Sequence, residues 1–84
     1  MTYEVYLARS AIKDMRRLPQ TIRRRVDREL LRLEEQPYGG RRKKLAGEAG
    51  YRAVVGAYRI LYEIDDDAKR VTVTAVRHRR EAYR

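Results

Sequence analysis

The chain contains no cysteine, no tryptophan and no phenylalanine, and it has a single histidine. Without cysteine it has neither disulfides nor thiolate ligands for a metal. One histidine is too few for a conventional zinc site, so we predict no metal and no cofactor. No apolar run approaches the roughly 20 residues that span a bilayer, and the N-terminus lacks the apolar region of a signal peptide. We therefore expect a cytoplasmic protein with no membrane partner.

Positive charge is what the sequence has in excess. The 84 residues carry 21 Lys and Arg against 12 Asp and Glu, a net charge of +9. A chain of this length forms one domain, so we predict a single domain over residues 1–84. Such an excess of cations favours a polyanionic partner, either nucleic acid, an acidic membrane surface or an acidic protein. Charge alone does not choose among these, or exclude a basic protein with no nucleic-acid role.

The first half of the chain predicts a strand and two helices. Residues 2–7 are rich in β-branched and aromatic residues and place one set on a common face, Tyr3, Val5 and Leu7. Residues 8–17 form a short helix with an apolar stripe of Ile12, Met15 and Leu18. Pro19 ends this helix and suits the first turn of a longer one, which runs to about residue 36. Its apolar positions recur at helical spacing, at Ile22, Val26, Leu30 and Leu33. Together the helices form a hairpin that covers one face of a sheet.

Two basic segments of this half leave alternatives open. The outer face of the second helix is rich in arginine, which suits either nucleic acid or a solvated surface, and no helix-turn-helix, zinc-finger or basic-zipper pattern supports base readout. Residues 38–50 are punctuated by glycine and predict a loop. The loop carries a run of four cations, which either contacts a nucleic-acid backbone or is a solvated linker: Arg41, Arg42, Lys43 and Lys44.

The last third predicts three strands, over residues 51–55, 58–64 and 71–78. A two-residue turn at Gly56-Ala57 places Val55 opposite Tyr58 and pairs Val54 with Arg59 and Arg52 with Leu61. The three aspartates at positions 65–67 predict a surface turn, because the other ligands of a calcium loop are missing. The whole is an α+β fold, β-α-α-β-β-β, with the helical hairpin on one face of a mainly antiparallel four-stranded sheet.

Alternation along these strands predicts two different faces. Ile60, Tyr62, Ile64, Val71, Val73 and Ala75 are expected under the helices. Thr72, Thr74, Val76 and His78 are then expected on the opposite face with Arg52 and Arg59. Further cations and a tyrosine follow the last strand: Arg77, Arg79, Arg80 and Tyr83. This face is expected to hold either RNA or a segment of a partner protein.

Several motifs together resemble the RelE/ParE superfamily of toxins from type II toxin–antitoxin pairs. They span essentially the whole chain: the tyrosine-rich first strand, K-x-x-x-x-L-P from Lys13 to Pro19, KKLAG, G-x-YRILYEIDDD and VRHRREAYR. The tail is similar to the RelE branch, which implies a ribosome-dependent endoribonuclease that cuts mRNA in the A site of the 70S ribosome. The alternative is the ParE branch, which binds DNA gyrase without cutting RNA.

The resemblance also implies site residues. Arg59 is expected to contact the scissile phosphate, and Arg79, Tyr83 and Arg52 match further family positions. One departure is Val54, where the best-known RelE type has a lysine two residues after the position of Arg52. We assign Arg59, His78, Arg79 and Tyr83 to catalysis, and a second set to RNA binding: Arg52, Lys43, Lys44, Arg77 and Arg80. The resemblance further implies an acidic antitoxin, bound in a toxin–antitoxin hetero-oligomer.

Ordinary pKa values divide the chemistry among the catalytic set. Cleaving RNA without a metal needs a base for the 2′-hydroxyl, a cation for the phosphorane and an acid for the 5′-oxygen. Arginine suits the cation, but its deprotonation at pH 7 costs upwards of about 7 kcal/mol, against about 4 kcal/mol for tyrosine. Histidine costs almost nothing. His78 is therefore either the acid or the base, unless its role is structural. Tyr83 then stacks on a base or transfers a proton.

Overall fold

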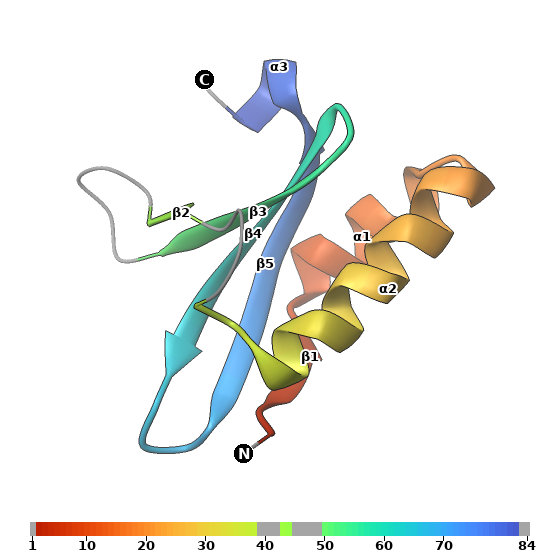
Figure 1. Ribbon diagram of the computed structural model, residues 1–84. Helices are drawn as coiled ribbons and strands as arrows, with labels where there is room; N and C mark the ends of the chain where they lie inside the picture. The colour runs from red at the N-terminus through yellow and green to blue at the C-terminus, as the bar shows by residue number, and fades with distance from the viewer. Residues whose placement is uncertain (1, 39–42, 45–49, 83–84) are drawn as a thin grey trace.

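The computed structural model describes residues 2–38, 43–44 and 50–82, and these carry five strands and three helices. In chain order (Figure 1) they are β1 (Glu4–Leu7), α1 (Arg9–Arg17), α2 (Gln20–Glu35), β2 (Lys43–Lys44), β3 (Tyr51–Val55), β4 (Tyr58–Asp65), β5 (Arg70–His78) and α3 (Arg79–Ala82). The predicted β-α-α-β-β-β order is confirmed. Two short elements were not predicted: β2 lies within the expected loop, and α3 follows the last strand.

The sheet has the order β1-β5-β4-β3-β2. β1 runs parallel to β5, and the other neighbours are antiparallel. The predicted mainly antiparallel sheet is confirmed, with β2 as a further edge strand beside β3. All three pairings predicted for the β3–β4 hairpin are also confirmed, Val55 with Tyr58, Val54 with Arg59 and Arg52 with Leu61. At the turn, Gly56 has a φ of 58°, a left-handed conformation that glycine adopts without steric cost.

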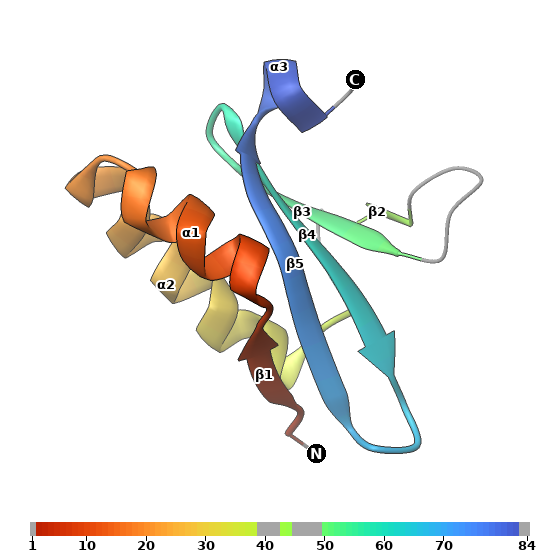
Figure 2. The same cartoon turned by 180° about the vertical axis from the view of Figure 1, so that it is seen from behind.

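Helices α1 and α2 lie side by side on one face of the sheet, and within the described part of the chain the other face has no helical layer (Figures 1 and 2). The core between these layers contains Val26, Leu33, Ile60, Tyr62, Val71 and Val73, all fully buried. The apolar stripe predicted for α2 is confirmed, because Ile22 and Leu30 pack against this core as well. Among the described residues, none of the helices is long and apolar enough to cross a membrane.

The stripe predicted for α1 is wrong at one position. Ile12 is exposed, and its neighbour Ala11 is fully buried together with Met15 and Leu18. Ala11, Met15 and Leu18 are spaced by four and three residues, so they also form one helical face. Helix α1 packs closely on β5, and an alanine at the contact allows the two backbones to approach. The hydrophobicity of the side chains alone did not show whether Ala11 or Ile12 belongs to the buried face of α1.

The break between the helices is stabilised by an arginine of the basic face. Leu18 and Pro19 are extended, so the last carbonyl groups of α1 need partners outside the helix. Arg23 bonds to two carbonyl groups at this break, donating from Nε to the Met15 carbonyl at 3.2 Å and from Nη2 to the Leu18 carbonyl at 3.3 Å. Part of the arginine content of α2 therefore serves the helical hairpin itself.

Candidate functional site

A β-bulge in β5 determines which side chains reach the open face of the sheet. Tyr62 is opposite Val73, but its neighbour Leu61 is opposite Ala75, so Thr74 is an extra residue without a partner on β4. Before the bulge β5 alternates as predicted, with Val71 and Val73 in the core. An extra residue reverses the alternation beyond it. Ala75, Val76 and His78 therefore each lie on the face opposite to the one predicted.

This reversal corrects the predicted site. Val76 is opposite Ile60 and belongs to the core, whereas Ala75 is opposite Leu61 on the open face. His78 is opposite Tyr58, on the face that the helices cover, so its predicted position beside Arg59 is wrong. Arg77 occupies that position, because its Cα is the direct partner of Arg59. The sequence carried one signal of this, since Ala75 and Val76 interrupt the alternation of VTVTAVRH.

Arg59 and Arg77 form a cross-strand pair of cations on the open face. Arg77 is exposed and Arg59 is half-buried. Like charges directly opposite one another in a sheet are destabilising. The ion pair between Glu29 and Arg32 lies on α2 and involves neither Arg59 nor Arg77. An anion bound between the two guanidinium groups would offset the repulsion between them. A phosphate suits this position, because planar guanidinium groups match the geometry of phosphate oxygens.

The Arg59 side chain is held by main-chain acceptors. Its Nη1 donates to the Tyr58 carbonyl at 3.1 Å and to the Gly56 carbonyl at 3.3 Å, so one edge of the guanidinium is fixed against the hairpin turn. Its Nε is buried and has no hydrogen-bond partner among the described residues. A buried donor without an acceptor costs about 1–3 kcal/mol. Arg59 is thus positioned by the fold while part of its donor capacity is unused within residues 2–38, 43–44 and 50–82.

The turn of the β3–β4 hairpin brings further arginines to this end of the sheet. The Arg79 N–H donates to the Ala57 carbonyl at 2.7 Å and so ties the start of α3 to the turn. Arg25 of α2 lies against the other side, where a Cβ on Gly56 would be 3.1 Å from Arg25 Nη1. Sequence reasoning missed Arg25, because nothing in the helical pattern distinguishes it from the other arginines of α2. Four arginines, Arg25, Arg59, Arg77 and Arg79, therefore come from four different elements to one end of the sheet.

His78 is the last residue of β5, next to this cationic end. Its ring packs edge-to-face on Tyr58, with centroids 5.3 Å apart and planes at 80°. Its Nδ1 accepts from the Arg80 N–H at 3.3 Å, so the neutral ring carries its proton on Nε2. The hydrogen bond from the backbone thus fixes which ring nitrogen carries the proton in the neutral form.

The structure describes some of the remaining predicted site residues and not others. Arg52 is half-buried and its Cα pairs with both Leu61 and Lys43, two residues from Val54 on the same open face. Val54, directly opposite Arg59, is 37% exposed. Arg80 is exposed in α3. The side chains of Lys43 and Lys44, and all of Tyr83, lie outside the described part of the chain.

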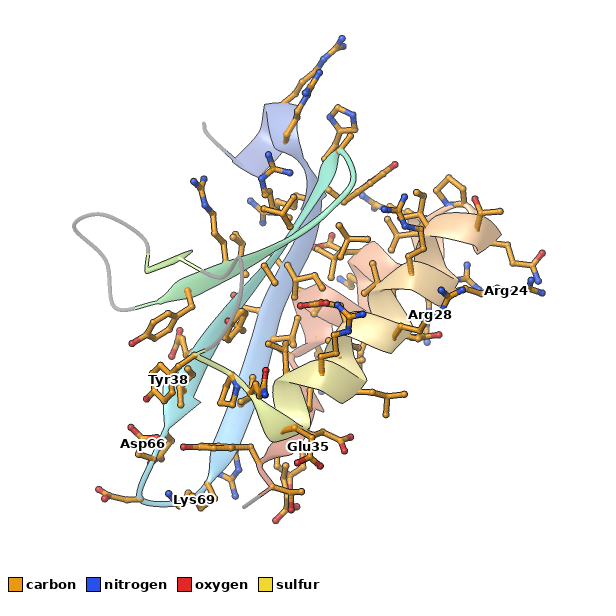
Figure 3. The ribbon with its side chains drawn as sticks, in the orientation of Figure 1. Arg24, Arg28, Glu35, Tyr38, Asp66 and Lys69 are labelled. Carbon is orange, nitrogen blue, oxygen red and sulfur yellow. The ribbon has the colours of Figure 1, made fainter. Side chains whose placement is uncertain are left out.

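The opposite end of the sheet has a different chemistry. Asp66, in the β4–β5 turn, accepts hydrogen bonds from Tyr38 at 2.6 Å and from Tyr3 at 2.7 Å. Figure 3 shows Tyr38, Asp66 and Lys69 at this end. The two hydrogen bonds, that of Tyr38 first, lower the pKa of Asp66, and the same bonds raise the pKa of both phenols. The predicted acidic turn is confirmed, and Asp66 joins the segment after α2 to it.

Among the described residues, the structure shows no cluster of histidine, aspartate and glutamate that could hold a metal ion. What it shows is a small α+β domain whose helical hairpin covers one sheet face, with cations gathered at one end of the other face. These features define a class of small basic proteins with a helical hairpin on one face of the sheet and cations at one end of the other.

Comparison with known sequences specifies the family. A profile described as ParE toxin of type II toxin-antitoxin system, parDE, matches residues 5–83. Toxin RelG of Mycobacterium tuberculosis is 35% identical over 92 residues, covering 100% of this chain and 99% of RelG. The chain belongs to the RelE/ParE superfamily and is a type II toxin.

Solved structures agree in fold. The toxin–antitoxin complex RelBE2 from Mycobacterium tuberculosis matches with a TM-score of 0.81 and 29% identity, covering 93% of this chain and 99% of that chain. The archaeal RelE–RelB complex from Pyrococcus horikoshii matches with a TM-score of 0.82 and 28% identity, covering 94% of this chain and 97% of that chain. A mutant of toxin RelE from E. coli in the free state matches with a TM-score of 0.83 and 26% identity, covering 99% of this chain and 90% of that chain. The RelE-like fold that the motifs predicted is confirmed.

Proposed function

We propose that this toxin is a ribosome-dependent endoribonuclease that cleaves translated mRNA and thereby inhibits translation. The observation that carries the proposal is the cross-strand pair of Arg59 and Arg77 on the open face. Two permanent cations facing one another lower stability unless an anion lies between them. Such an arrangement suits a scissile phosphate, whose negative charge increases in the transition state.

The reaction needs no cofactor. The 2′-oxygen of the ribose attacks the adjacent phosphorus as its proton passes to a base, and the P–O5′ bond breaks as an acid protonates the 5′-oxygen. The products are a 2′,3′-cyclic phosphate and a free 5′-hydroxyl. Arg59 and Arg77 stabilise the phosphorane, with Arg59 held in place by the carbonyl groups of Gly56 and Tyr58. Arg79 adds charge from the start of α3.

His78 is the proposed proton-transfer group. Because Nδ1 accepts from the backbone, Nε2 is the atom that exchanges the proton. The structure adds a requirement that the sequence did not show: His78 is on the opposite face of β5 from Arg77, so it acts from the end of the strand. RNA must then bend around the end of the sheet between the two residues. Tyr83, which follows α3 in sequence, is the proposed stacking or second proton-transfer group.

An acidic antitoxin is the proposed protein partner. The solved relatives include RelE–RelB complexes from Pyrococcus horikoshii and E. coli, which supports a toxin–antitoxin hetero-oligomer for this chain. A net charge of +9 favours an acidic partner and makes its association fast and sensitive to salt. Arg52, Lys43, Lys44 and Arg80 are the proposed RNA contacts around the site.

The test uses purified toxin and ribosomes programmed with a defined mRNA, with the 5′ ends of the products mapped. Arg59→Ala should lower the cleavage rate by about 10²–10³-fold, the scale for removing one stabiliser of the transition state. Arg24→Ala is the matched control, since it removes the same charge from the outward face of α2 (Figure 3) and should leave the rate unchanged. Equal rates for both variants and the unmodified toxin would exclude the proposal.

A ParE-like function is the second candidate, because the matching family profile is described as a ParE toxin. In this second function the toxin binds DNA gyrase and cleaves no RNA. The same preparation separates the two functions: intact mRNA on programmed ribosomes together with inhibited supercoiling by gyrase would establish the second candidate in place of the first.

A further inference from the structure

Helix α1 makes two hydrogen bonds to the bulged segment of β5. The Ser10 hydroxyl donates to the Thr74 carbonyl, and the Val76 N–H donates to Asp14 Oδ2 at 2.9 Å. Ser10 and Asp14 are four residues apart, so they lie on the same face of α1. On the sheet side, the Thr74 hydroxyl donates to the Leu61 carbonyl at 3.2 Å. Three side chains thus bond to the backbone exactly where the β4–β5 pairing shifts.

These bonds satisfy backbone groups that the bulge disturbs. A bulge leaves an extra residue unpaired and interrupts the ladder of hydrogen bonds around it. Buried backbone groups without partners are strongly disfavoured. Val76 is 3% exposed, and its N–H is satisfied by the partly buried carboxylate of Asp14. The sequence of β5 alone does not fix the bulge at Thr74, because an extra residue can be accommodated elsewhere along a strand.

A regular strand would dismantle the arginine pair. If β5 continued from the Tyr62–Val73 pair without the extra residue, Val76 would be opposite Arg59 and Arg77 opposite Tyr58. Arg77 would then face the helices. The position of one extra residue therefore decides whether Arg59 faces a cation or a valine.

We propose that Asp14, assisted by Ser10, is a positioning residue of the toxin. By holding the bulge at Thr74 it sets the alternation of β5 from Ala75 onward, and so places Arg77 opposite Arg59. Neither residue touches RNA. The proposal rests on the proposed function only for its effect on cleavage, because the geometry that it predicts is measured independently.

The test compares the toxin with Asp14→Ala, Asp14→Asn and Asp27→Ala. Asparagine keeps an acceptor oxygen of the same shape, so Asp14→Asn should preserve the pairing. Asp27 is exposed on α2, so Asp27→Ala controls for the loss of one negative charge. NMR reports the pairing through cross-strand NOEs between Arg59 and Arg77 and between the rings of Tyr58 and His78, and the programmed ribosomes report cleavage.

Asp14→Ala should weaken both sets of NOEs and lower cleavage by about 10-fold or more, since misplacement of a catalytic group by about 1 Å can cost 10²-fold. Asp14→Asn and Asp27→Ala should match the unmodified toxin in both measurements. Unmodified NOEs and cleavage in Asp14→Ala would overturn the proposal. If Asp14→Ala does not fold, Ser10→Ala decides in the same way, through weakened or unchanged NOEs.

Failure of the positioning role can be distinguished from failure of the proposed function. If the unmodified toxin cuts no mRNA but Asp14→Ala disturbs the Arg59–Arg77 pairing, the positioning role stands and the proposed function fails. If the toxin cuts mRNA and Asp14→Ala changes neither the pairing nor the rate, the proposed function stands and the positioning role fails.

Discussion

The two ends of the sheet treat charge in opposite ways. At the β4–β5 turn, Asp66 accepts from two tyrosines and Lys69 lies 5.3 Å from the ring centroid of one of them, Tyr3. At the β3–β4 turn, Arg59 and Arg77 face one another, and Arg59 Nε has no partner within the described residues. At the first end, Tyr3 and Tyr38 thus bond to the Asp66 carboxylate within the chain. At the second end, part of the donor capacity of Arg59 is unused among the described residues, which supports the proposed anion site.

This comparison predicts that substitutions at the two ends separate activity from stability. Removing a cation at the β3–β4 end should reduce function and relieve repulsion. Removing a hydrogen bond at the β4–β5 end should reduce stability and leave the chemistry of each folded molecule unchanged.

The largest effect is expected for Arg77→Ala, which removes half of the cation pair. Cleavage on programmed ribosomes should fall by about 10²–10³-fold. The melting temperature should stay the same or rise, because the like-charge contact with Arg59 is gone. Arg70→Ala is the control at the other end of the same strand, where Arg70 lies 4.9 Å from the Tyr6 ring centroid. A comparable loss of cleavage in both variants would contradict the division between the ends.

A second variant, Tyr62→Phe, tests stability at the opposite end. The Tyr62 hydroxyl is buried and donates to the carbonyl of Pro37, also a buried residue, at 2.7 Å. Its removal leaves that acceptor without this donor, so the free energy of unfolding should fall by about 1–3 kcal/mol in denaturant titrations. Tyr6→Phe, at an exposed tyrosine, should cost less. Cleavage per folded molecule should be unchanged in both, and a selective loss in Tyr62→Phe would argue against a purely structural role.

The smallest effect is expected for Asp66→Asn, and it should depend on pH. Hydrogen bonds from Tyr38 and Tyr3 lower the pKa of Asp66, so its ionised form stabilises the fold above the unfolded pKa of about 4. That contribution is lost as the pH falls through the lowered folded pKa. The same hydrogen bond raises the pKa of Tyr38, so the protonated phenol also stabilises the fold at pH values below its unfolded pKa of about 10. This contribution is lost as the pH rises through the raised folded pKa.

Denaturant unfolding at a series of pH values measures this difference. The stability of the unmodified toxin should exceed that of Asp66→Asn between about pH 5 and about pH 9, and the two should converge in acid. Asp67→Asn is the control, at an exposed residue of the same turn. A difference between Asp66→Asn and the unmodified toxin that persists undiminished in strong acid would rule out the ionised carboxylate as its source.

Much of the fold follows from local patterns. The apolar spacing of α2, the Pro19 break and the glycine of the β3–β4 turn each predicted an element that the structure contains. The hairpin register was predicted residue by residue, because a two-residue turn leaves a single pairing. The site was predicted less completely. Arg59 was placed correctly, but His78 was assigned to the wrong face, and the pairing of Arg77 with Arg59 was not predicted.

The sequence by itself determined the order of the elements, the basic character of the protein and the arginine on β4, since these depend on composition and on short-range periodicity. Only the tertiary structure decided which residue stands opposite Arg59. That choice depends on one extra residue in β5, bonded by Ser10 and Asp14 about 60 positions earlier in the chain. Contacts so distant in sequence leave no periodic signal along either segment. The arginine pair is therefore a property of the folded sheet, although both arginines can be read from the sequence.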